Sequence, residues 1–395
     1  MNKKQHTVIV SAVRTPMGSF NGIFSSIPAT KLGSLAIAEA LQRIHLSAQR
    51  VDEVYMGCVL SAGLGQAPAR QAAIGAGIPN SIGATTVNKV CGSSLKTVIM
   101  AAQAIAVGDA RIVVAGGMEN MTRAPYLLEK ARQGYRLGHG ELTDSLIKDG
   151  LWDVYNNFHM GHAGELCAAE YRFTRTEVDD FALESYRRAR EAIATGAFKR
   201  EIASVEVPQK KGGPPVVTED EEPNRVDLGK LRSLQPAFQE DGVLTVGNSP
   251  SCNDGAAALV VMAEDEASTL GLTPMARIVG YAGAALAPAW FTIAPVEAIK
   301  LVLKKTGLSL ADIDLFEINE AFSAVSLAIN RELALDPKKI NVNGGAVALG
   351  HPIGATGARI LTTLLYAMEA RGSRRGIASL CIGGGEALAI VVERP

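Results

Sequence analysis

Two segments of the chain share one pattern of apolar and polar positions: a short apolar run, a glycine-containing turn and a long stretch with helical periodicity. In the first, residues 84–90 predict a strand, the turn contains Cys91, and the periodic stretch ends at Gly108. In the second, residues 340–343 predict a strand, the turn contains His351, and the periodic stretch ends near Gly372. Apolar residues at intervals of three and four predict helices that bury one face. These residues are Leu95, Val98, Ile99, Ala102, Ile105 and Ala106 in the first segment and Ile360, Leu361, Leu364, Leu365 and Met368 in the second.

Other segments repeat in the same order. Amphipathic helical patterns over 35–44 and 296–305 are each followed by Leu-Ser and then by an apolar run, over 51–56 and 313–318. Apolar runs over 111–117 and 376–383 both end in glycines and predict central strands. This order indicates two duplicated α/β halves, although α/β units also resemble one another by chance.

Charge separates a middle segment from these halves. Residues 121–251 hold nearly half of the charged residues in about a third of the length, together with polar, turn-rich runs over 210–215 and 219–223. We therefore expect a solvent-exposed insertion over 121–251. The amino-terminal half is then expected to comprise 1–120 and 252–274, and the carboxyl-terminal half 275–395.

The composition excludes several classes of protein. A formal net charge of −1 offers no electrostatic footprint for nucleic acid or an anionic membrane surface. The five cysteines are scattered and form no C-x-x-C pair, so we expect free thiols in a reducing compartment. The first residues lack the apolar run of a signal peptide, and the uncharged stretch 278–296 contains two prolines, which argues against a membrane span. We expect a cytoplasmic protein.

Cys91 and His351 are the first candidates for chemistry. A thiol at a helix N-terminus feels the positive end of the helix dipole, so its pKa can fall towards neutrality and give a thiolate nucleophile. The ordinary alternative for Cys91 is a small buried apolar side chain without chemistry. The alternative for His351 is a structural role. Because the two residues precede equivalent helices, we expect His351 to act as a base for Cys91. Ser93 or Ser94 is expected to cap the helix that follows Cys91.

Two further polar side chains end apolar strands. Cys381 precedes three consecutive glycines, and Asn319 follows the apolar run 313–318. Side chains at the carboxyl ends of strands point into the crevice where α/β proteins bind ligands. The alternatives are an inert core thiol for Cys381 and, for Asn319, a cap on a helix that starts near residue 321.

The sequence gives little support for a transition-metal site, a phosphate-binding loop or a dinucleotide site. His159, His162 and Cys167 lack a suitably spaced fourth ligand for a transition metal. The segment 345–351 nearly matches a phosphate-binding loop, but His351 stands where that motif needs lysine. No G-x-G-x-x-G follows a predicted strand, so neither nucleotide hydrolysis nor a dinucleotide cofactor is expected.

Four ordered segments resemble the active-site segments of the thiolase family, and the resemblance covers essentially the whole chain. They are V-C-G-S-S (90–94), N-E-A-F (319–322), G-H-P (350–352) and C-I-G-G-G (381–385). H-M-G at 159–161 and N-D-G-A-A-A at 253–258 are also thiolase-like. H-M-G and the run 293–322 are most similar to short-chain acetoacetyl-CoA thiolases, especially the potassium-activated mitochondrial kind.

The resemblance implies an α/β thiolase fold: two duplicated halves with mixed five-stranded sheets, layered αβαβα, and an inserted loop domain that covers coenzyme A. It implies a ping-pong condensation of two acetyl-CoA to acetoacetyl-CoA and coenzyme A, and the reverse thiolysis. Cys91, activated by His351, would accept the acetyl group, and Cys381 would remove a proton from the second acetyl-CoA. One oxyanion site would comprise His351 and a water held by Asn319, and the other the backbone N–H groups of Cys91 and Gly383.

The resemblance also assigns binding residues. The contacts to the adenosine end of coenzyme A are Arg225, Val226, Asp227 and Lys230, and those to the pantetheine and acyl groups are His159, Met160, Phe238, Ala321 and Phe322. The potassium ligands are the Tyr186 hydroxyl and the backbone carbonyls of Val246, Gly247, Ser249 and Val347. For the adenosine contacts the alternative is an ordinary solvated charged loop. For the pantetheine and acyl contacts the alternative is plain core packing. The resemblance implies no covalent or redox cofactor. It implies assembly as a homodimer or homotetramer.

One loop departs from the family pattern. Pro250 stands where relatives keep a serine that contacts coenzyme A, and Cys252 replaces a leucine. Proline lacks an N–H and restricts the residue before it, so this contact is lost or the loop is rebuilt. Three alternatives to a short-chain thiolase remain: a broader-chain 3-ketoacyl-CoA thiolase, a ketoacyl-synthase-type condensing enzyme that would not need Cys381, and a non-catalytic acyl-CoA-binding relative.

Overall fold

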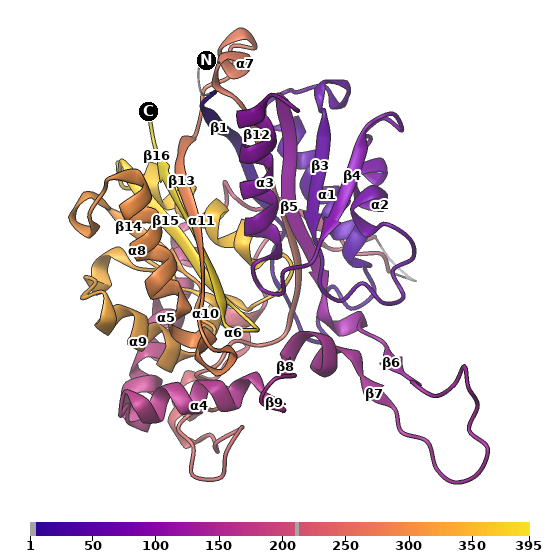
Figure 1. Cartoon of the computed structure of the whole chain (residues 1–395), viewed down its shortest axis with the longest axis vertical. Helices are drawn as coiled ribbons and strands as arrows, with labels where there is room; N and C mark the ends of the chain where they lie inside the picture. Colours follow the sequence, from indigo (N-terminus) through magenta and orange to yellow (C-terminus); the bar gives the residue numbers. More distant parts are fainter. Residues whose placement is uncertain (1–4, 210–212) are drawn as a thin grey trace.

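The structure is a computed structural model that describes residues 5–209 and 213–395. The first four residues of the amino-terminal segment and residues 210–212 of the turn-rich run therefore lie outside the described residues. Figure 1 shows the whole chain, with the two halves side by side and the insertion below them.

Five strands form the sheet of the amino-terminal half. Their order is β4 (Gly83–Val87), β3 (Glu53–Gly57), β5 (Ile112–Asn120), β12 (Asn253–Ala263) and β1 (Thr7–Arg14). β3 pairs parallel with β4 and β5, whereas β12 runs antiparallel to β5 and β1. The short β2 (Gly18–Ser19) pairs with β12. The sheet is therefore mixed, and a segment distant in sequence, β12, lies between β5 and β1.

The carboxyl-terminal half repeats this arrangement with one strand fewer. Its order is β14 (Leu315–Ile318), β15 (Arg375–Ile382), β16 (Glu386–Glu393) and β13 (Ala276–Ala285). β14 pairs parallel with β15, and the other pairs are antiparallel. The predicted strand over 340–343 is reduced to a single bridge between Ile340 and Phe316. Asn341 has φ of 43°, which takes the chain out of the extended conformation directly after that bridge.

The two halves share one continuous sheet. β1 and β13 pair antiparallel through Val8 with Arg277 and Ile9 with Ala276. In the described part of the chain these two residue pairs alone join the halves along the sheet, and Figure 1 shows the strands of the two halves diverging from this junction. Helices and the loop that precedes the helix over 356–370 make further contacts between the halves.

Helices form three layers around the sheet. α3 (Ser93–Val107) and α11 (Thr356–Ala370) pack against each other between the halves, and their apolar faces share one buried cluster with strands of both. α1 (Ala29–Gln42) and α2 (Pro68–Gly75) cover the outer face of the amino-terminal half. α8 (Ala294–Thr306) and α9 (Ser323–Glu332) cover that of the carboxyl-terminal half. The layers follow the order αβαβα.

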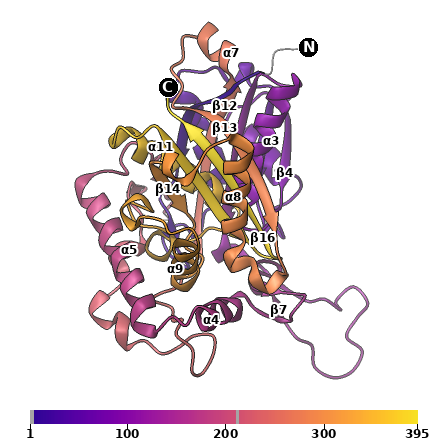
Figure 2. The same ribbon diagram turned by 60° about the vertical axis from the view of Figure 1, so that its left-hand side comes forward.

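The insertion between β5 and β12 packs mainly on the carboxyl-terminal half. β6 (Tyr126–Leu127) and β7 (Thr143–Asp144) pair at the base of a long hairpin that projects from the body (Figure 1). A second pair, β8 (Trp152–Asp153) and β9 (Phe158–His159), leads into α4 (Met160–Glu170) and α5 (Arg175–Thr195). Both helices contact α9, as Figure 2 shows from the side.

Short elements complete the described chain. They are β10 (Val205–Glu206) paired with β11 (Val216–Val217), α6 (Glu222–Arg225), α7 (Glu264–Thr269) and α10 (Ala346–Leu349). One stretch, Val90–Val107, is long and apolar enough to cross a membrane by length and composition. It contains α3, whose residues Leu95, Val98 and Ile105 are fully buried in the central layer, so core packing accounts for its hydrophobicity.

Candidate active site

The turns before α3 and α11 meet at one end of the central layer. The Ser94 hydroxyl accepts a hydrogen bond from the Ala358 backbone N–H at 2.9 Å. A Cβ on Gly357 would collide with the backbone of Leu95, so the first turns of the two helices touch. Cys91 and His351 precede these turns, and the duplicated architecture therefore brings them to the same end of the layer.

A strained turn presents Cys91. Val90, the residue before it, has φ of 45°, a left-handed conformation that a β-branched residue adopts only when its surroundings impose it. The Ser93 hydroxyl accepts the Lys89 N–H at 2.8 Å and donates to the Val90 carbonyl at 2.7 Å. Gly92 is the N-cap of α3, with no side-chain cap. The prediction that Ser93 or Ser94 caps α3 is wrong, because both hydroxyls hold the two active-site turns instead.

The end of β15 packs directly on this turn. A Cβ on Gly92 would collide with the Ile382 side chain, which follows Cys381. The backbone N–H groups of Gly383 and Cys91 lower the pKa of the Cys91 thiol, but burial outweighs them and raises it to about 11. Burial also raises the pKa of Cys381 well above its usual range, and Cys91 raises it further. The predicted fall of the Cys91 pKa towards neutrality is therefore not found: both thiols are neutral at rest.

His351 is held as a neutral imidazole with one free nitrogen. Its Nδ1 lies 2.7 Å from the Thr356 hydroxyl, and that hydroxyl donates its one proton to the Pro352 carbonyl at 2.9 Å. This network assigns the imidazole proton to Nδ1 and leaves Nε2 as an acceptor. Burial, and then the nearby Arg359 charge, lower the pKa of His351 to about 3. The imidazole therefore has the protonation state of a general base at neutral pH.

Asn319 is buried without partners for its side chain. It lies one residue beyond β14, and its backbone N–H donates to the Ser379 carbonyl at 3.0 Å. Its side chain is 1% exposed, and within the described residues neither Nδ2 nor Oδ1 has a hydrogen-bond partner. A buried polar group left without a partner costs about 1–3 kcal/mol. α9 begins at Ser323 with Phe322 as its cap, so Asn319 does not cap that helix and is free for a ligand or water.

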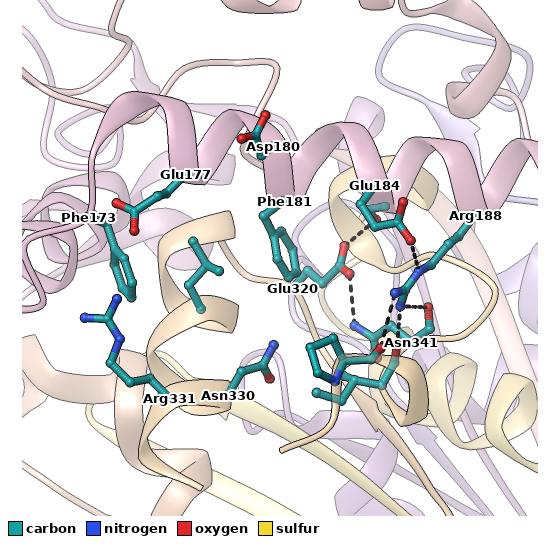
Figure 3. A pocket seen from close by; sticks show the side chains of 14 residues that line it. Phe173, Glu177, Asp180, Phe181, Glu184, Arg188, Glu320, Asn330, Arg331 and Asn341 are labelled. Carbon is teal, nitrogen blue, oxygen red and sulfur yellow. Dashed lines mark hydrogen bonds and ion pairs between the residues drawn. The ribbon is translucent and has the colours of Figure 1, made fainter. Parts of the chain in front are cut away.

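The neighbouring Glu320 ties this segment to two others. Its carboxylate accepts hydrogen bonds from the Ser185 hydroxyl at 2.7 Å, the Asn341 amide at 3.0 Å and the Val347 N–H at 3.0 Å. Figure 3 shows Glu320 and Asn341 in the lining of a cleft of about 550 Å³ between α5 and α9. None of the residues that line this cleft was predicted to be catalytic or to bind coenzyme A.

An aromatic wall belongs to the same buried cluster as Cys381. The Phe238 ring stacks on His159 with centroids 5.3 Å apart and meets Phe322 edge-on at 5.8 Å. The Met160 sulfur lies 3.7 Å from the point that a Cβ on Gly383 would occupy. The structure thus brings the predicted pantetheine and acyl residues together, with Ala321 buried next to Phe322. His159 also accepts the Gly161 N–H and caps α4.

The predicted adenosine contacts lie on an exposed segment. Arg225 pairs with Glu221 at 3.0 Å, Lys230 pairs with Asp227 at 3.5 Å, and their side chains are 53% and 79% exposed. Asp227 caps the short 3-10 helix that follows it, and the Val226 carbonyl accepts a hydrogen bond from Arg190. Exposed ion pairs of this kind hold their cations weakly, so both cations can turn to an anion.

The predicted potassium ligands lie partly around one buried leucine. Tyr186 and Val347 belong to the same buried cluster as Leu231, and Gly247 packs against that leucine. The Ser249 hydroxyl is buried and has no partner in the described part of the chain, whereas the Val246 side chain is exposed. Among the described residues no group of three His, Cys, Asp or Glu side chains is arranged to hold a metal ion.

The sequence analysis missed the supports of these groups. Thr356 holds the imidazole, Glu320 holds the segment after Asn319, and the buried Glu119 accepts backbone N–H groups from both halves. A charged residue at the end of the apolar run 111–120 was the available signal for Glu119.

Comparisons with known proteins agree over the whole chain. Residues 7–265 match the family description "Thiolase, N-terminal domain", and residues 272–394 match "Thiolase, C-terminal domain". The acetyl-CoA acetyltransferase of Escherichia coli is 52% identical over 392 residues, 99% of each chain, and that of Schizosaccharomyces pombe is 51% identical over 387 residues, 98% of each chain. The crystal structure of the Bacillus anthracis acetyl-CoA acetyltransferase matches with a TM-score of 0.97 at 41% identity and covers 100% of both chains. The predicted fold class is confirmed, and the chain belongs to the thiolase family.

Proposed function

We propose that the chain is an acetyl-CoA C-acetyltransferase that condenses two acetyl-CoA to acetoacetyl-CoA and coenzyme A and catalyses the reverse thiolysis. The observation that carries this proposal is the proximity of two thiols, Cys91 and Cys381, at the start of a helix that packs on the helix after His351. The neutral His351 imidazole and the buried Asn319 amide, which has no partner within the described residues, support it. A condensing enzyme with one thiol would not require Cys381 there. The similar proteins are named acetyl-CoA acetyltransferases, which supports the same acyltransferase reaction. We assign this reaction to lipid metabolism as part of the proposal.

In the first half-reaction Cys91 is the nucleophile. Its sulfur attacks the thioester carbon of acetyl-CoA while His351 Nε2 takes the thiol proton. The oxyanion on that carbon accepts hydrogen bonds from the N–H groups of Cys91 and Gly383, which already face the sulfur. Collapse of the intermediate breaks the bond to the coenzyme A sulfur, which takes the proton from His351. Acetylated Cys91 and free coenzyme A result.

In the second half-reaction Cys381 is the base. It first releases its own proton to water, and the resulting thiolate removes a proton from the methyl group of a second acetyl-CoA. The enolate oxygen is stabilised by a water held by Asn319 and by His351 in the tautomer that carries its proton on Nε2. The carbanion attacks the acetyl carbon on Cys91, a carbon–carbon bond forms and the bond to the Cys91 sulfur breaks. Cys381 keeps the substrate proton, and the Cys91 thiolate takes a proton from water in place of the one that Cys381 released, so both thiols end neutral as they began. Asn319 suits this role because its amide has no hydrogen-bond partner to release among the described residues.

Short-chain specificity rests on the aromatic wall. Phe238, Phe322 and Met160 pack in the cluster that contains Cys381, and the rings of His159, Phe238 and Phe322 contact one another, so we expect this wall to limit the length of the acyl group. The test is steady-state thiolysis of acetoacetyl-CoA and of 3-ketoacyl-CoAs of six to sixteen carbons. We expect kcat/KM to fall sharply beyond four carbons. A value for longer substrates equal to or above that for acetoacetyl-CoA would favour the alternative, a broader-chain 3-ketoacyl-CoA thiolase.

Coenzyme A is proposed to lie along the insertion, without any covalent or redox cofactor. Arg225 and Lys230 suit its phosphates, because they are exposed cations whose only ion pairs are at the surface. Pro250 removes one backbone donor from the loop that would contact it. Replacing Arg225 by Ala should raise KM for coenzyme A and leave kcat nearly unchanged, since this contact is remote from the thiols.

Potassium is proposed to bind between α5 and the loop over 246–249. Tyr186, Val347 and Gly247 surround Leu231, and the Ser249 hydroxyl has no partner, which fits a cation held by hard oxygen ligands. Glu222 and Glu320 add negative charge near Tyr186, and Arg190 opposes it. When bound, potassium would order this loop. Michaelis constants for acetoacetyl-CoA and coenzyme A should be lower in potassium than in sodium buffers of equal ionic strength, and equal values would remove the ion.

Assembly as a dimer or tetramer in the cytoplasm completes the proposal. The projecting hairpin exposes Leu128, Leu137 and Leu142, apolar side chains that a partner subunit could cover. All five cysteines are free thiols, as in a reducing compartment. Light scattering of the purified protein gives the subunit number, and cell fractionation gives the compartment.

A further inference from the structure

Glu119 is a buried carboxylate that binds only backbone N–H groups and one thiol. It lies in β5, one residue before the end of the strand, and it is fully buried. One oxygen accepts the Val59 N–H at 3.0 Å and the Gly354 N–H at 2.9 Å, and the other accepts the Leu60 N–H at 3.1 Å. The Cys58 thiol lies 3.7 Å from it. Within the described chain it forms no ion pair, so these weak donors alone stabilise its charge.

The three N–H groups come from both halves of the molecule. Val59 and Leu60 follow β3 in the amino-terminal half. Gly354 belongs to the carboxyl-terminal half and lies between His351 and Thr356, on the loop that carries the imidazole and its hydrogen-bond partner. Glu119 therefore fixes the His351 loop to a strand of the opposite half.

The packing around Gly354 leaves this loop one position. A Cβ on Gly354 would collide with the Glu119 carboxylate, and a Cβ on Gly117, two residues earlier in β5, would collide with the Gly354 carbonyl. The loop at Gly354 thus packs directly on β5 at both Glu119 and Gly117. Its height above the strand sets where His351 Nε2 stands relative to Cys91, which belongs to the amino-terminal half.

The geometry points to Glu119 as a positioning residue that holds the His351 loop at the distance from Cys91 which acyl transfer needs. This inference rests on the proposed function of His351. Only a carboxylate meets the demand, because three N–H groups need acceptors on both of its oxygens. A glutamine offers one oxygen, and its amide N–H₂ would face an N–H group. Reacting groups displaced by about 1 Å can lose about 100-fold in rate.

If Glu119 acted only through its charge, removing that charge would raise the rate of Cys91 acetylation instead of lowering it. The charge of Glu119 raises the pKa of Cys91, and burial raises the pKa of Glu119 itself to about 7. A neutral Gln at this position would therefore make Cys91 easier to ionise. If Glu119 acted only through its charge, the variant would be acetylated faster than the wild type, whereas a positioning role makes it slower.

The experiment compares E119Q with D52N in the purified full-length protein. Asp52 accepts the N–H groups of Arg111 at 2.7 Å and Ile112 at 2.9 Å, so it makes the same kind of contact at the opposite end of β5. We measure kcat and KM for thiolysis of acetoacetyl-CoA, the rate of Cys91 acetylation by acetyl-CoA, and hydrogen exchange in the peptide 350–356. E119Q should lose 10- to 100-fold in kcat and in acetylation rate, with KM within about threefold, and exchange should rise in 350–356. D52N should keep all three.

Each outcome decides the inference. An E119Q rate within twofold of the wild type, a faster acetylation, or an equal loss in D52N overturns it. If E119Q does not fold, E119D withdraws the charged group by one CH₂ and must show the same loss of kcat with KM retained. A wild type that cleaves no acetoacetyl-CoA contradicts the proposed function instead, and exchange in 350–356 then still shows whether Glu119 holds the loop.

Discussion

Thr356→Val tests the assignment of His351 as a base at a single atom. Valine has the shape of threonine and lacks the hydroxyl that accepts the His351 Nδ1 proton at 2.7 Å. Thr356 and His351 are both buried, so no water replaces the lost acceptor without entering the core. The Nδ1–H group is left unpaired, and the tautomer with the proton on Nε2 becomes comparatively more favourable. That tautomer cannot accept the Cys91 proton.

The expected loss follows from this hydrogen bond. Leaving a buried donor unpaired costs about 1–3 kcal/mol, which corresponds to a roughly 5- to 150-fold lower rate for the step that needs the productive tautomer. We expect the loss in kcat and in the rate of Cys91 acetylation. KM should change little, because Thr356 lies under the imidazole and the predicted coenzyme A contacts come from the insertion and from residues 321 and 322.

Thr362→Val is the matched control on the same helix. Thr362 is fully buried, and its hydroxyl has no partner in the described chain, so valine there should keep kcat and leave the melting temperature unchanged or slightly higher. The assay is thiolysis of acetoacetyl-CoA at pH 8 with melting temperatures measured in parallel. A T356V enzyme with wild-type kcat would refute the role of Nε2 as the acceptor, and so would an equal loss in T362V.

Three further changes test the other groups. Cys91→Ala should abolish formation of the acetyl-enzyme, and mass spectrometry that finds the acetyl group on Cys381 alone would reverse the assignment. Cys381→Ala should keep acetylation of Cys91 and lose condensation by at least about 100-fold, since only condensation needs α-proton removal; near wild-type condensation would contradict this. Gly161→Ala should raise KM for acetoacetyl-CoA severalfold, because its Cβ would collide with the Phe238 ring and disturb the stack on His159; an unchanged KM would argue against a substrate contact at Phe238.

The sequence was most informative where one local pattern determines one element. The helical periodicities after Cys91 and His351 predicted α3 and α11, and the repeated order of segments predicted the duplication. The fifth strand of the carboxyl-terminal half was predicted wrongly, because apolar residues over 340–343 favour a strand whereas Asn341 turns the chain away. The pattern of apolar and polar positions does not reveal which residue adopts a left-handed backbone conformation.

The supports of the site were missed for a different reason. Glu119, Glu320 and Thr356 act through contacts with residues 5 to 235 positions away, and no local pattern announces such a partner. The serine hydroxyls at 93 and 94 matched the local rule for a helix cap and were used elsewhere, because the two helix starts pack on each other. Tertiary contacts override the local sequence rules for helix caps where two elements pack together at a functional site.

The raised pKa values of the two thiols also set the order of the half-reactions. Cys91 ionises before Cys381, since Gly383 and Cys91 N–H groups face its sulfur and since Cys91 itself raises the pKa of Cys381. The free enzyme therefore holds at most one thiolate, at the nucleophile. Acetylation removes the charge that Cys91 can carry, so the pKa of Cys381 falls and the base becomes available only when an acetyl group is in place to be attacked. Alkylation of Cys381 by iodoacetamide at a fixed pH should accordingly be faster in the acetylated enzyme than in the free enzyme, and an equal or slower rate would show that the two thiols ionise independently.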